Sequence, residues 1–521
     1  MKVKMKYISM LLVAVLITVI VAACSSNNSN NGKNSNNSNI SNASTAENSE
    51  QANDSINDAI KDPYELTLSI PVFGAIPKDL AEVQAEINKI TQAEINTTVT
   101  ILPISIGAFG QQMNLMMSSG EKLDLAFVFG AGGMYNSYAV SGKILPIDGL
   151  FPKYGEGITE AVGAEYIEGA TVDGKIYGVP TNHAFAQKPA IYMRKDLVEK
   201  HNIDVASIKS FEDLGSVFKT IKDNEPGIVP LASGLTSPLE YYRTYDRLGD
   251  GYGVLPEFDN GLKVENYYES TEYADLLNVV RDWYTSGYIN KDAATTQSTP
   301  VDLVKANKAF SYMMSSKPET LGQEERLAGK ELVVVDLLPT AYSTTNDLLV
   351  GLWTIAQQSE NPERAMMFLD LMYTNQDIVN LMMWGVENKH YVKVSDNVID
   401  YPTGVDASNI GYSMQAWLVS NPFISYTIKT DDPELWNNTK AYNESATKSK
   451  ALGFAFSSEP VKNEITALNN VVNQYKKILQ TGTIDPAKKL SEFNAKLKDA
   501  GIDKVIAEKQ KQLDAWAAAK K

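Results

Sequence analysis

The sequence has one cysteine and three histidines among its 521 residues, and both shortages exclude kinds of site. A single cysteine, Cys24, forms no disulfide within the chain, so packing must stabilise the fold. The histidines His183, His201 and His390 lie far apart, and no HExxH or CxxC spacing is present. We therefore expect no metal site and no cofactor.

Basic residues are also few, with 47 lysines and arginines against 63 acidic residues and a net charge of −16. Nucleic-acid binding needs a basic face, so this balance argues against a nucleic-acid partner. No GxSxG elbow, Walker A loop or GxGxxG motif is present. The length and the 44% hydrophobic content suffice for two lobes, each with its own core.

The N-terminus has the layout of a bacterial export signal. Lys2, Lys4 and Lys6 precede an uncharged apolar run from Ile8 to Val21, and small residues lead to Cys24. The segment 21–24, Val-Ala-Ala-Cys, resembles a lipobox, in which the cysteine is acylated after cleavage. The alternative is an uncleaved membrane anchor, for which the apolar run is short. We expect a signal peptide over 1–23 and a lipid at Cys24.

Asparagine and serine dominate residues 24–62, which hold almost no large apolar side chain. Such a segment buries too little surface to offset its ordering entropy, so we interpret it as a disordered linker. As a flexible coil it reaches about 35 Å, enough to hold a domain away from a membrane. Long Asn/Ser tethers resemble those of lipoproteins on the outer face of the Gram-positive cell membrane.

Folding signals begin at Pro63. Leu66, Leu68 and Ile70 alternate with polar residues, as expected of a strand, and a helical spacing of apolar residues follows from Leu80. A second alternating stretch and then the continuous apolar run 123–129 predict further strands, the last one covered on both faces. This order favours an α/β fold with parallel strands. The periodicity of 461–479 and 505–516 predicts helices at the C-terminus.

Several segments resemble one family of transport proteins. They are 137–147 (SYAVSGKILPI), 173–180 (DGKIYGVP), 192–197 (YMRKDL) and 361–365 (NPERA), with 385–391, 453–456, 460–462, 482–486 and 500–504 matching a Gram-positive subgroup. Through their order and spacing the chain resembles the extracellular solute-binding lipoproteins of ABC importers, in the carbohydrate-binding family that includes maltose-binding protein.

The resemblance implies a two-lobe periplasmic-binding-protein-like fold with an interlobe hinge and extra C-terminal helices. We expect lobe 1 over 63–185 and 346–410, and lobe 2 over 186–345 and 411–521. It further implies a monomer that captures a mono- or oligosaccharide between its lobes, without catalysis, and delivers it to the transmembrane permease of an ABC transporter.

Aromatic plates and planar hydrogen-bonding side chains suit a sugar ligand. In the first lobe, Phe129 and Tyr135 are candidate stacking residues and Asn136 a candidate hydrogen-bonding residue. Their loop has glycines where maltose-binding protein has Trp and Asp, which departs from the maltose-type mode. The alternative is a glycine-rich loop with Tyr135 packed inside its own lobe.

Further candidates follow along the chain. Asn182, His183 and Gln187 fall at the first crossing between lobes, where His183 binds ligand or serves as a hinge residue. Tyr242 and Arg243 belong to a Tyr/Arg-rich stretch that forms a cleft wall or interlobe pairs; an arginine there could also hold the carboxylate of an acidic sugar.

Three tryptophans complete the candidates, namely Trp353, Trp384 and Trp417. Each is interpreted either as a plate for the ligand or as core. Two other functions stay open from the sequence: a cell-attached glycoside-active enzyme, which needs a pair of carboxylates, and a ligand sensor for a membrane receptor.

Overall fold

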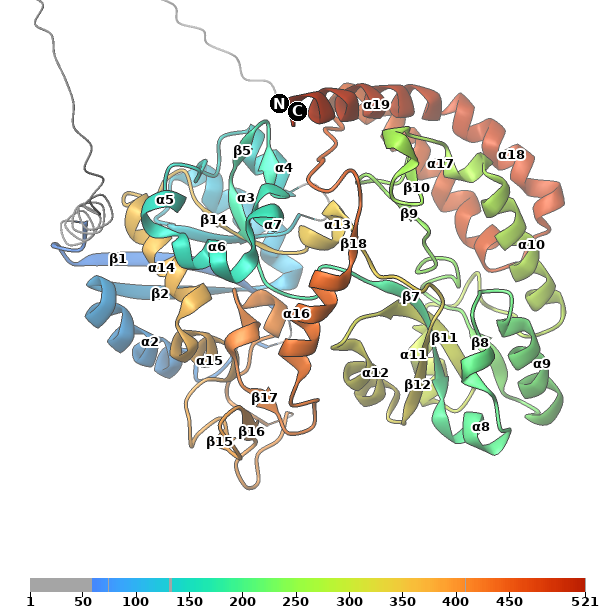
Figure 1. The fold of residues 1–521 in the computed structure, drawn as a ribbon, viewed down its shortest axis with the longest axis horizontal. Coiled ribbons are helices and arrows are strands. Elements are labelled where there is room, and N and C mark those ends of the chain that lie inside the picture. Colours follow the sequence, from blue (N-terminus) through green and yellow to red (C-terminus); the bar gives the residue numbers. More distant parts are fainter. Residues whose placement is uncertain (1–58, 74, 131–133, 408, 521) are drawn as a thin grey trace, which may run out of the picture. The chain divides into compact units, whose positions relative to one another are not determined.

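The computed structural model describes residues 59–73, 75–130, 134–407 and 409–520, which belong to one compact unit (Figure 1). The predicted signal peptide, Cys24 and the linker up to residue 58 lie outside the described residues. Within the described ranges, no helix combines the length and the apolar character that a membrane span requires.

The first lobe is built on a five-stranded sheet with the order β2-β1-β3-β14-β6. Its strands are β1 (Tyr64–Val72), β2 (Thr97–Ser105), β3 (Leu125–Val128), β6 (Gly178–Pro180) and β14 (Leu352–Ile355). Strands β1, β2 and β3 are parallel, and β14 is antiparallel to both β3 and β6. The predicted strand–helix–strand unit is confirmed, and β3 is buried along its whole length, as its apolar run predicts.

Helices cover this sheet and enclose the first core. They are α2 (Leu80–Ile95), α3 (Ile106–Ser119), α4 (Met134–Val140), α5 (Phe151–Tyr154), α6 (Glu156–Val162), α7 (Ala164–Glu168), α14 (Pro362–Thr374) and α15 (Gln376–Trp384). Helix α2 ends at Ile95, and the next residue, Asn96, adopts φ 48° and redirects the chain into β2. The first core continues into residues far along the chain, including Leu418 and Val419.

The second lobe is built on a four-stranded sheet with the order β12-β7-β11-β8. Its strands are β7 (Lys188–Arg194), β8 (Val229–Ala232), β11 (Ala309–Ser316) and β12 (Leu332–Asp336). Its helices are α8 (Lys195–Lys200), α9 (Leu214–Asn224), α10 (Thr271–Thr285), α11 (Pro300–Lys305) and α12 (Thr320–Ala328). Strand β7 lies antiparallel between β11 and β12, so the sheet is mixed.

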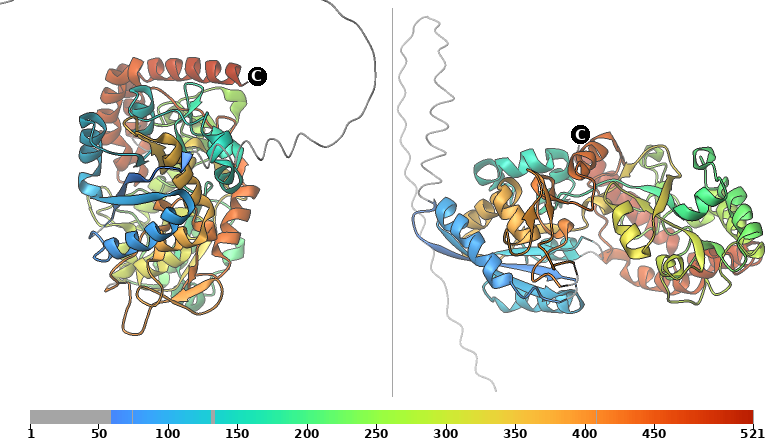
Figure 2. Two further views of the ribbon diagram at one scale, coloured as in Figure 1. Left: turned by 90° about the vertical axis from the view of Figure 1, so that its left-hand side faces the viewer. Right: turned by 90° about the horizontal axis from the view of Figure 1, so that it is seen from below.

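Three C-terminal helices, drawn in red in Figures 1 and 2, pack beside the second lobe. They are α17 (Lys462–Gln480), α18 (Pro486–Asp499) and α19 (Ile502–Ala519). Leu468, Leu479 and Phe493 are fully buried in the second core. The amphipathic pattern predicted for 461–479 is therefore confirmed, because its apolar side faces that core.

Short elements complete the chain. They are β4 (Thr171–Val172), β5 (Lys175–Ile176), β9 (Tyr245–Asp246), β10 (Leu255–Pro256), β13 (Tyr342–Ser343), α13 (Thr345–Leu348), β15 (Val392–Lys393), β16 (Val398–Asp400), β17 (Thr427–Ile428), α16 (Leu435–Ser445) and β18 (Thr447–Lys448). Two separate sheets with two cores, and helices after them, match the two-lobe α/β fold expected from the sequence.

Three stretches of chain pass between the two cores, at 181–187, 342–347 and 443–449, and they are bonded to one another. The side chain of Asn443 accepts a hydrogen bond from Phe185 N at 2.7 Å and donates one to His183 O at 2.8 Å. Ser343 Oγ donates to Phe185 O at 2.7 Å. Because Leu418 and Val419 pack in the first core, we propose the last crossing near Asn443 instead of at residue 410.

A buried arginine on α14 ties together the start of the first lobe, which gives a stability prediction. Arg364 is 1% exposed and donates to the carbonyls of Ile95, Asn96, Ala59 and Asp62. Arg364→Met removes these four hydrogen bonds, so we expect the free energy of unfolding in urea to fall by roughly 3 kcal/mol or more. Arg326→Met, in an exposed pair with Asp431, is the control and should change it by under about 1 kcal/mol. Equal effects of the two variants would contradict the prediction.

Candidate functional site

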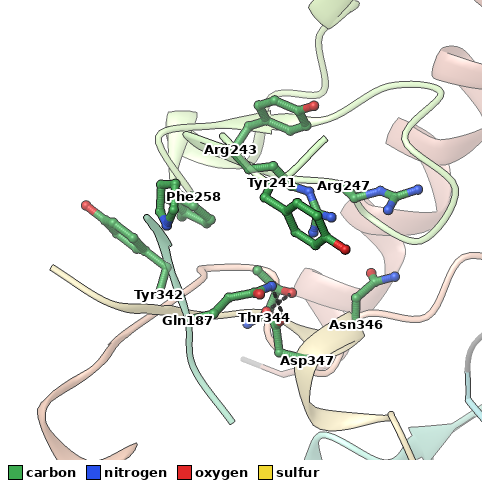
Figure 3. A pocket seen from close by; sticks show the side chains of 11 residues that line it. Gln187, Tyr241, Arg243, Arg247, Phe258, Tyr342, Thr344, Asn346 and Asp347 are labelled. Carbon is green, nitrogen blue, oxygen red and sulfur yellow. Dashed lines mark hydrogen bonds between the residues drawn. The ribbon is translucent and has the colours of Figure 1, made fainter. Parts of the chain in front are cut away.

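A solvent-open pocket of about 440 Å³ lies where a second-lobe loop approaches the crossing segments and α13 (Figure 3). Its lining residues come from four separate stretches of chain: Gln187, Pro189, Tyr241, Arg243, Tyr245, Arg247, Phe258, Tyr342, Thr344, Asn346 and Asp347. We refer to it as the site pocket. Figure 3 shows Tyr241, Arg243 and Arg247 on one side, Gln187, Thr344, Asn346 and Asp347 on the other, and the Phe258–Tyr342 pair at one end.

The polar side of the site pocket is held rigidly by one carboxylate. Asp347 accepts from Thr344 N at 3.1 Å and from Thr344 Oγ1 at 2.6 Å, a capping box at the start of α13. Its other oxygen accepts from Gln187 Nε2 at 2.5 Å. Gln187 and Asp347 belong to two different crossings, so this bond joins the crossings at the pocket wall.

Aromatic side chains form another part of the wall. Phe258 and Tyr342 are stacked, with ring centroids 3.9 Å apart and planes 8° from parallel. The hydroxyl groups of Tyr241, Tyr245 and Tyr342 have no hydrogen-bond partner among the described residues. Burial raises the pKa of Tyr245 to about 12, so its hydroxyl is neutral at physiological pH. The wall thus offers apolar ring faces together with free hydroxyls.

Two arginines complete this wall. Arg243 Nε donates to Glu240 O at 3.1 Å, and within the described chain neither Arg243 nor Arg247 forms an ion pair. Guanidinium groups donate several hydrogen bonds in one plane, so both side chains keep free donors facing the pocket.

A reciprocal contact joins the lobes at the edge of the site pocket. Asn346 Oδ1 accepts from Gly249 N at 3.1 Å, and Asn346 Nδ2 donates to Gly249 O at 3.2 Å. Gly249 has φ 94°, a conformation that suits glycine. The two bonds fix the second-lobe loop against α13.

His183 lies behind the pocket in the first crossing and is buried. Its Nδ1 is 2.7 Å from Thr181 O and its Nε2 is 3.0 Å from Asp347 O. A neutral imidazole has one N–H and can donate to only one of these carbonyls. Burial, aided by the charge of Lys317, lowers the pKa of His183 to about 4 even though both carbonyls act to raise it. This geometry fits the hinge role that the sequence left open.

Among the residues proposed from sequence, Gln187 and Arg243 line the site pocket. Asn182 is buried in the first crossing and donates to Ala161 O and Asn421 Oδ1, at 3.0 and 2.9 Å. Tyr242 packs against Phe211 of the second core, with ring centroids 4.7 Å apart. Asn182, His183 and Tyr242 therefore contact protein in this structure, and a direct role in ligand binding stays a prediction for them.

The first-lobe candidates fall into two groups. Tyr135 is buried and donates to Ala170 O at 2.5 Å, and Trp353 is fully buried in β14; both are core here. Trp384 Nε1 donates to Tyr426 O at 3.0 Å. Asn136 is half-buried on α4, next to Tyr135. None of these four lines the site pocket, and their binding roles remain untested.

A partly exposed aromatic group lies at the carboxyl ends of β1 and β3. Trp417 packs edge-on against Phe73 and tilted against Phe129, with ring centroids 5.3 and 6.2 Å apart. Phe73 follows β1 and Phe129 follows β3, and the carboxyl ends of parallel strands are where open α/β sheets bind ligands. Phe129 and Trp417 therefore lie at strand ends, and a role in ligand binding stays a prediction for both.

Sequence reasoning missed most of the site pocket. It did not identify Pro189, Phe258, Tyr342, Thr344, Asn346 and Asp347, although it noted the Tyr/Arg-rich stretch that holds Tyr241, Tyr245 and Arg247. The capping pattern Thr344–Asp347 was readable as a helix start. Phe258, in contrast, stands in a loop with φ 60° and reaches Tyr342 only through tertiary folding, which no local pattern signals.

Comparison with known proteins defines the class. A model described as bacterial extracellular solute-binding protein matches residues 75–378, and one described as a domain of unknown function matches residues 450–518. A protein of Streptococcus pneumoniae serotype 4, described as a carbohydrate ABC transporter substrate-binding protein, is 31% identical over 456 residues, which are 86% of this chain and 90% of that protein. The chain therefore belongs to the bacterial extracellular solute-binding proteins.

A second relative and several solved structures are also similar to this chain. The polygalacturonan/rhamnogalacturonan-binding protein YtcQ of Bacillus subtilis is 24% identical over 246 residues, 43% of this chain and 47% of that protein. The N-glycan transport solute binding protein NgtS of S. pneumoniae superimposes with a TM-score of 0.78 at 29% identity, over 88% of this chain and 100% of the other. Its complexes with Man1GlcNAc and Man5GlcNAc give lower TM-scores, 0.67 and 0.65.

The low pKa of His183 predicts a pH-dependent loss of stability. Its folded-state pKa of about 4 lies below the reference value near 6.5, so the unfolded chain takes up the proton first as the pH falls. This contribution is complete above about pH 6.5 and is lost as the pH falls toward 4. In urea unfolding at pH 7 and pH 5, the drop in stability should be about 2 kcal/mol smaller for His183→Gln than for the unsubstituted protein. Identical drops for both proteins would refute the assignment.

Proposed function

We propose that this protein captures a carbohydrate between its lobes outside the cell and delivers it to the permease of an ABC transporter. The observation that supports this proposal most strongly is the composition of the site pocket. Stacked rings, free tyrosine hydroxyls and free guanidinium groups line it together, next to the crossings. Sugars present flat C–H faces and many hydroxyls, which match ring faces and polar donors. The description of the 31%-identical relative as a carbohydrate transporter protein supports the same ligand class.

We further propose that the exposed aromatic group of the first lobe, Phe73, Phe129 and Trp417, forms a second wall for the ligand. Closure about the crossings then brings the two walls together. NgtS supports this motion, because this chain matches its structure without a named ligand better than its two glycan complexes. A ligand that contacts Gln187 or Tyr342 touches the crossings themselves and thereby favours the closed state.

The proposal includes release of the ligand unchanged. Asp347 is the carboxylate of the site pocket, and both its oxygens are engaged by Thr344 and Gln187. Glycoside hydrolysis needs a pair of carboxyl groups across the scissile bond. After incubation with the protein, a bound oligosaccharide should show an unaltered mass.

The carbohydrate proposal is tested by thermal unfolding against a library of saccharides. Because a ligand that binds only the folded state raises the Tm, at least one saccharide should do so. Tyr342→Ala and Trp417→Ala should each weaken its affinity about fivefold, since each removes a ring face worth roughly 1 kcal/mol. Tyr342→Phe keeps the ring and should lose less, and Val394→Ala, exposed and distant in sequence from both walls, should lose nothing. If no saccharide of the library raises the Tm, the carbohydrate proposal is wrong.

We also propose that Cys24 carries the lipid that holds the protein on the outer face of the membrane. In a bacterium that expresses the full chain, the protein should sediment with membranes and be labelled by a palmitate analogue. Cys24→Ala should abolish labelling and shift the protein to the medium or the soluble fraction. A Ser25→Ala control should keep both properties. Unchanged membrane association of the Cys24→Ala protein would instead favour an uncleaved apolar segment as the anchor.

A further inference from the structure

A second pocket of about 690 Å³ adjoins the site pocket and shares Arg243, Tyr245 and Arg247 with it. Its other walls come from the loop 239–252, from Tyr267 and Tyr268, and from the C-terminal helix α17. The helix contributes Asn469, Val472, Lys476 and Gln480. The Tyr/Arg stretch therefore stands as a shared wall between two cavities, one of which is built in part by the C-terminal region.

Three tyrosine hydroxyls in this second pocket lack partners in the described part of the chain. The hydroxyls of Tyr245, Tyr267 and Tyr268 make no hydrogen bond to any described residue, whereas Tyr252 Oη donates to Asn469 Oδ1 at 2.7 Å. Tyr245 and Tyr267 lie with ring centroids 4.0 Å apart. The three hydroxyl oxygens are accessible to solvent in the pocket, and each can donate and accept a hydrogen bond, so together they suit a polar ligand.

In the second pocket the carboxylates form ion pairs, whereas the two arginines form none with any described residue. Its carboxylates are paired: Glu240 with Lys476 at 2.8 Å, and Asp250 with Lys509 at 2.6 Å. Arg243 and Arg247 have no carboxylate partner within the part of the chain that the structure describes. Burial acts to raise the pKa of Glu240, yet Lys476 and the two arginines hold it below its usual value, which shows the positive field there.

This arrangement is unusual for the chain. The sequence has only six arginines and a net charge of −16, so acidic partners are abundant. The other four are more fully engaged: Arg194 and Arg326 pair with carboxylates, and Arg281 and Arg364 donate to two or more backbone carbonyls. Among the described residues, Arg243 donates to one carbonyl, through Nε, and keeps its terminal nitrogens free. Two unpaired arginines four positions apart, both facing the shared wall, leave room for an anion from outside the protein.

We propose that the second pocket is a subsite for a carboxylate-bearing sugar unit of an oligosaccharide whose other units occupy the site pocket. This inference rests on the proposed carbohydrate function. Arg243 and Arg247 bind the carboxylate, a geometry that guanidinium groups favour, and the free tyrosine hydroxyls bind the sugar hydroxyls. The relative YtcQ, described as binding polygalacturonan, supports an acidic ligand class.

The proposal gives the C-terminal region, residues 450–518, a role in ligand binding. Helix α17 supplies one wall, and α19 fixes the loop that carries Arg247. Lys509 of α19 is 0% exposed and donates to Asp250 Oδ1 and to Gly253 O, at 2.6 and 3.1 Å. Through this buried contact the C-terminal helices hold the loop, and hence Arg247, at the mouth of both pockets.

The test compares acidic and neutral forms of the same saccharide by isothermal titration calorimetry on the mature chain. The probes are a galacturonic acid tetramer with its carboxyl-reduced form, and a sialylated N-glycan with its desialylated form. In at least one pair the acidic form should bind at least tenfold more tightly at low salt, and 0.5 M NaCl should shrink the ratio. Equal or weaker binding of the acidic form in both pairs overturns the inference.

Two variants locate the effect. Arg247→Gln should bring the acid-to-neutral affinity ratio close to one, whereas Arg326→Gln, engaged with Asp431, should keep it. Val472→Trp fills the second pocket from α17 and should also remove the preference; Gln474→Trp, exposed on the same helix, should not. The Tm of each unliganded variant verifies folding. A preserved ratio in both Arg247→Gln and Val472→Trp refutes the subsite, while binding of no saccharide in either form defeats the carbohydrate proposal itself.

Discussion

The hydrogen bonds that tie the three crossings together are the constraint on which the rest of this structure depends. Asn443 binds the backbone of His183 and Phe185, and Ser343 binds Phe185 from the second crossing. These bonds need three strands of chain, far apart in sequence, to run side by side. They leave the two cores separate while fixing the line about which the cores can turn.

The site pocket lies directly on this line. Gln187, Tyr342 and Asp347 belong to the crossings, so a ligand that contacts them contacts the hinge. In the proposed function, affinity and closure are coupled, because a ligand that prefers the closed arrangement shifts the balance between open and closed states by the same free energy. Apart from the Tyr342 hydroxyl, the free polar groups described around the pocket lie on the second-lobe loop, which Asn346 holds on one side and Lys509 on the other.

The parts of the fold that depend on local sequence patterns could be predicted from the sequence. The alternation at Leu66 and Leu68, the fully apolar strand Leu125–Val128 and the amphipathic C-terminal helix all appear as predicted. The motif 173–180 matches a hairpin, β4 to β5, turned by Asp173 and Gly174 at positive φ. These features are set by neighbours in sequence, so periodicity and turn chemistry suffice to find them.

The site was less readable, because residues from four stretches of chain form it. Sequence reasoning placed Gln187 and Arg243 near a cleft, but Trp353 and Tyr135, chosen for their ring faces, lie in the core. A large aromatic side chain buries well and binds sugars well, and only tertiary packing decides between the two uses. The pair Phe258–Tyr342 shows the converse, since neither residue stands in a pattern that distinguishes it.

The most direct test of this account is a crystal structure of the protein with a bound oligosaccharide that raises its Tm. The account predicts sugar density between the lobes, in contact with the Phe258–Tyr342 wall and the Arg243 guanidinium, with the crossings Gln187 and Asp347 alongside. Density confined to the outer surface of either lobe, with the site pocket empty and the lobes unmoved, would contradict it.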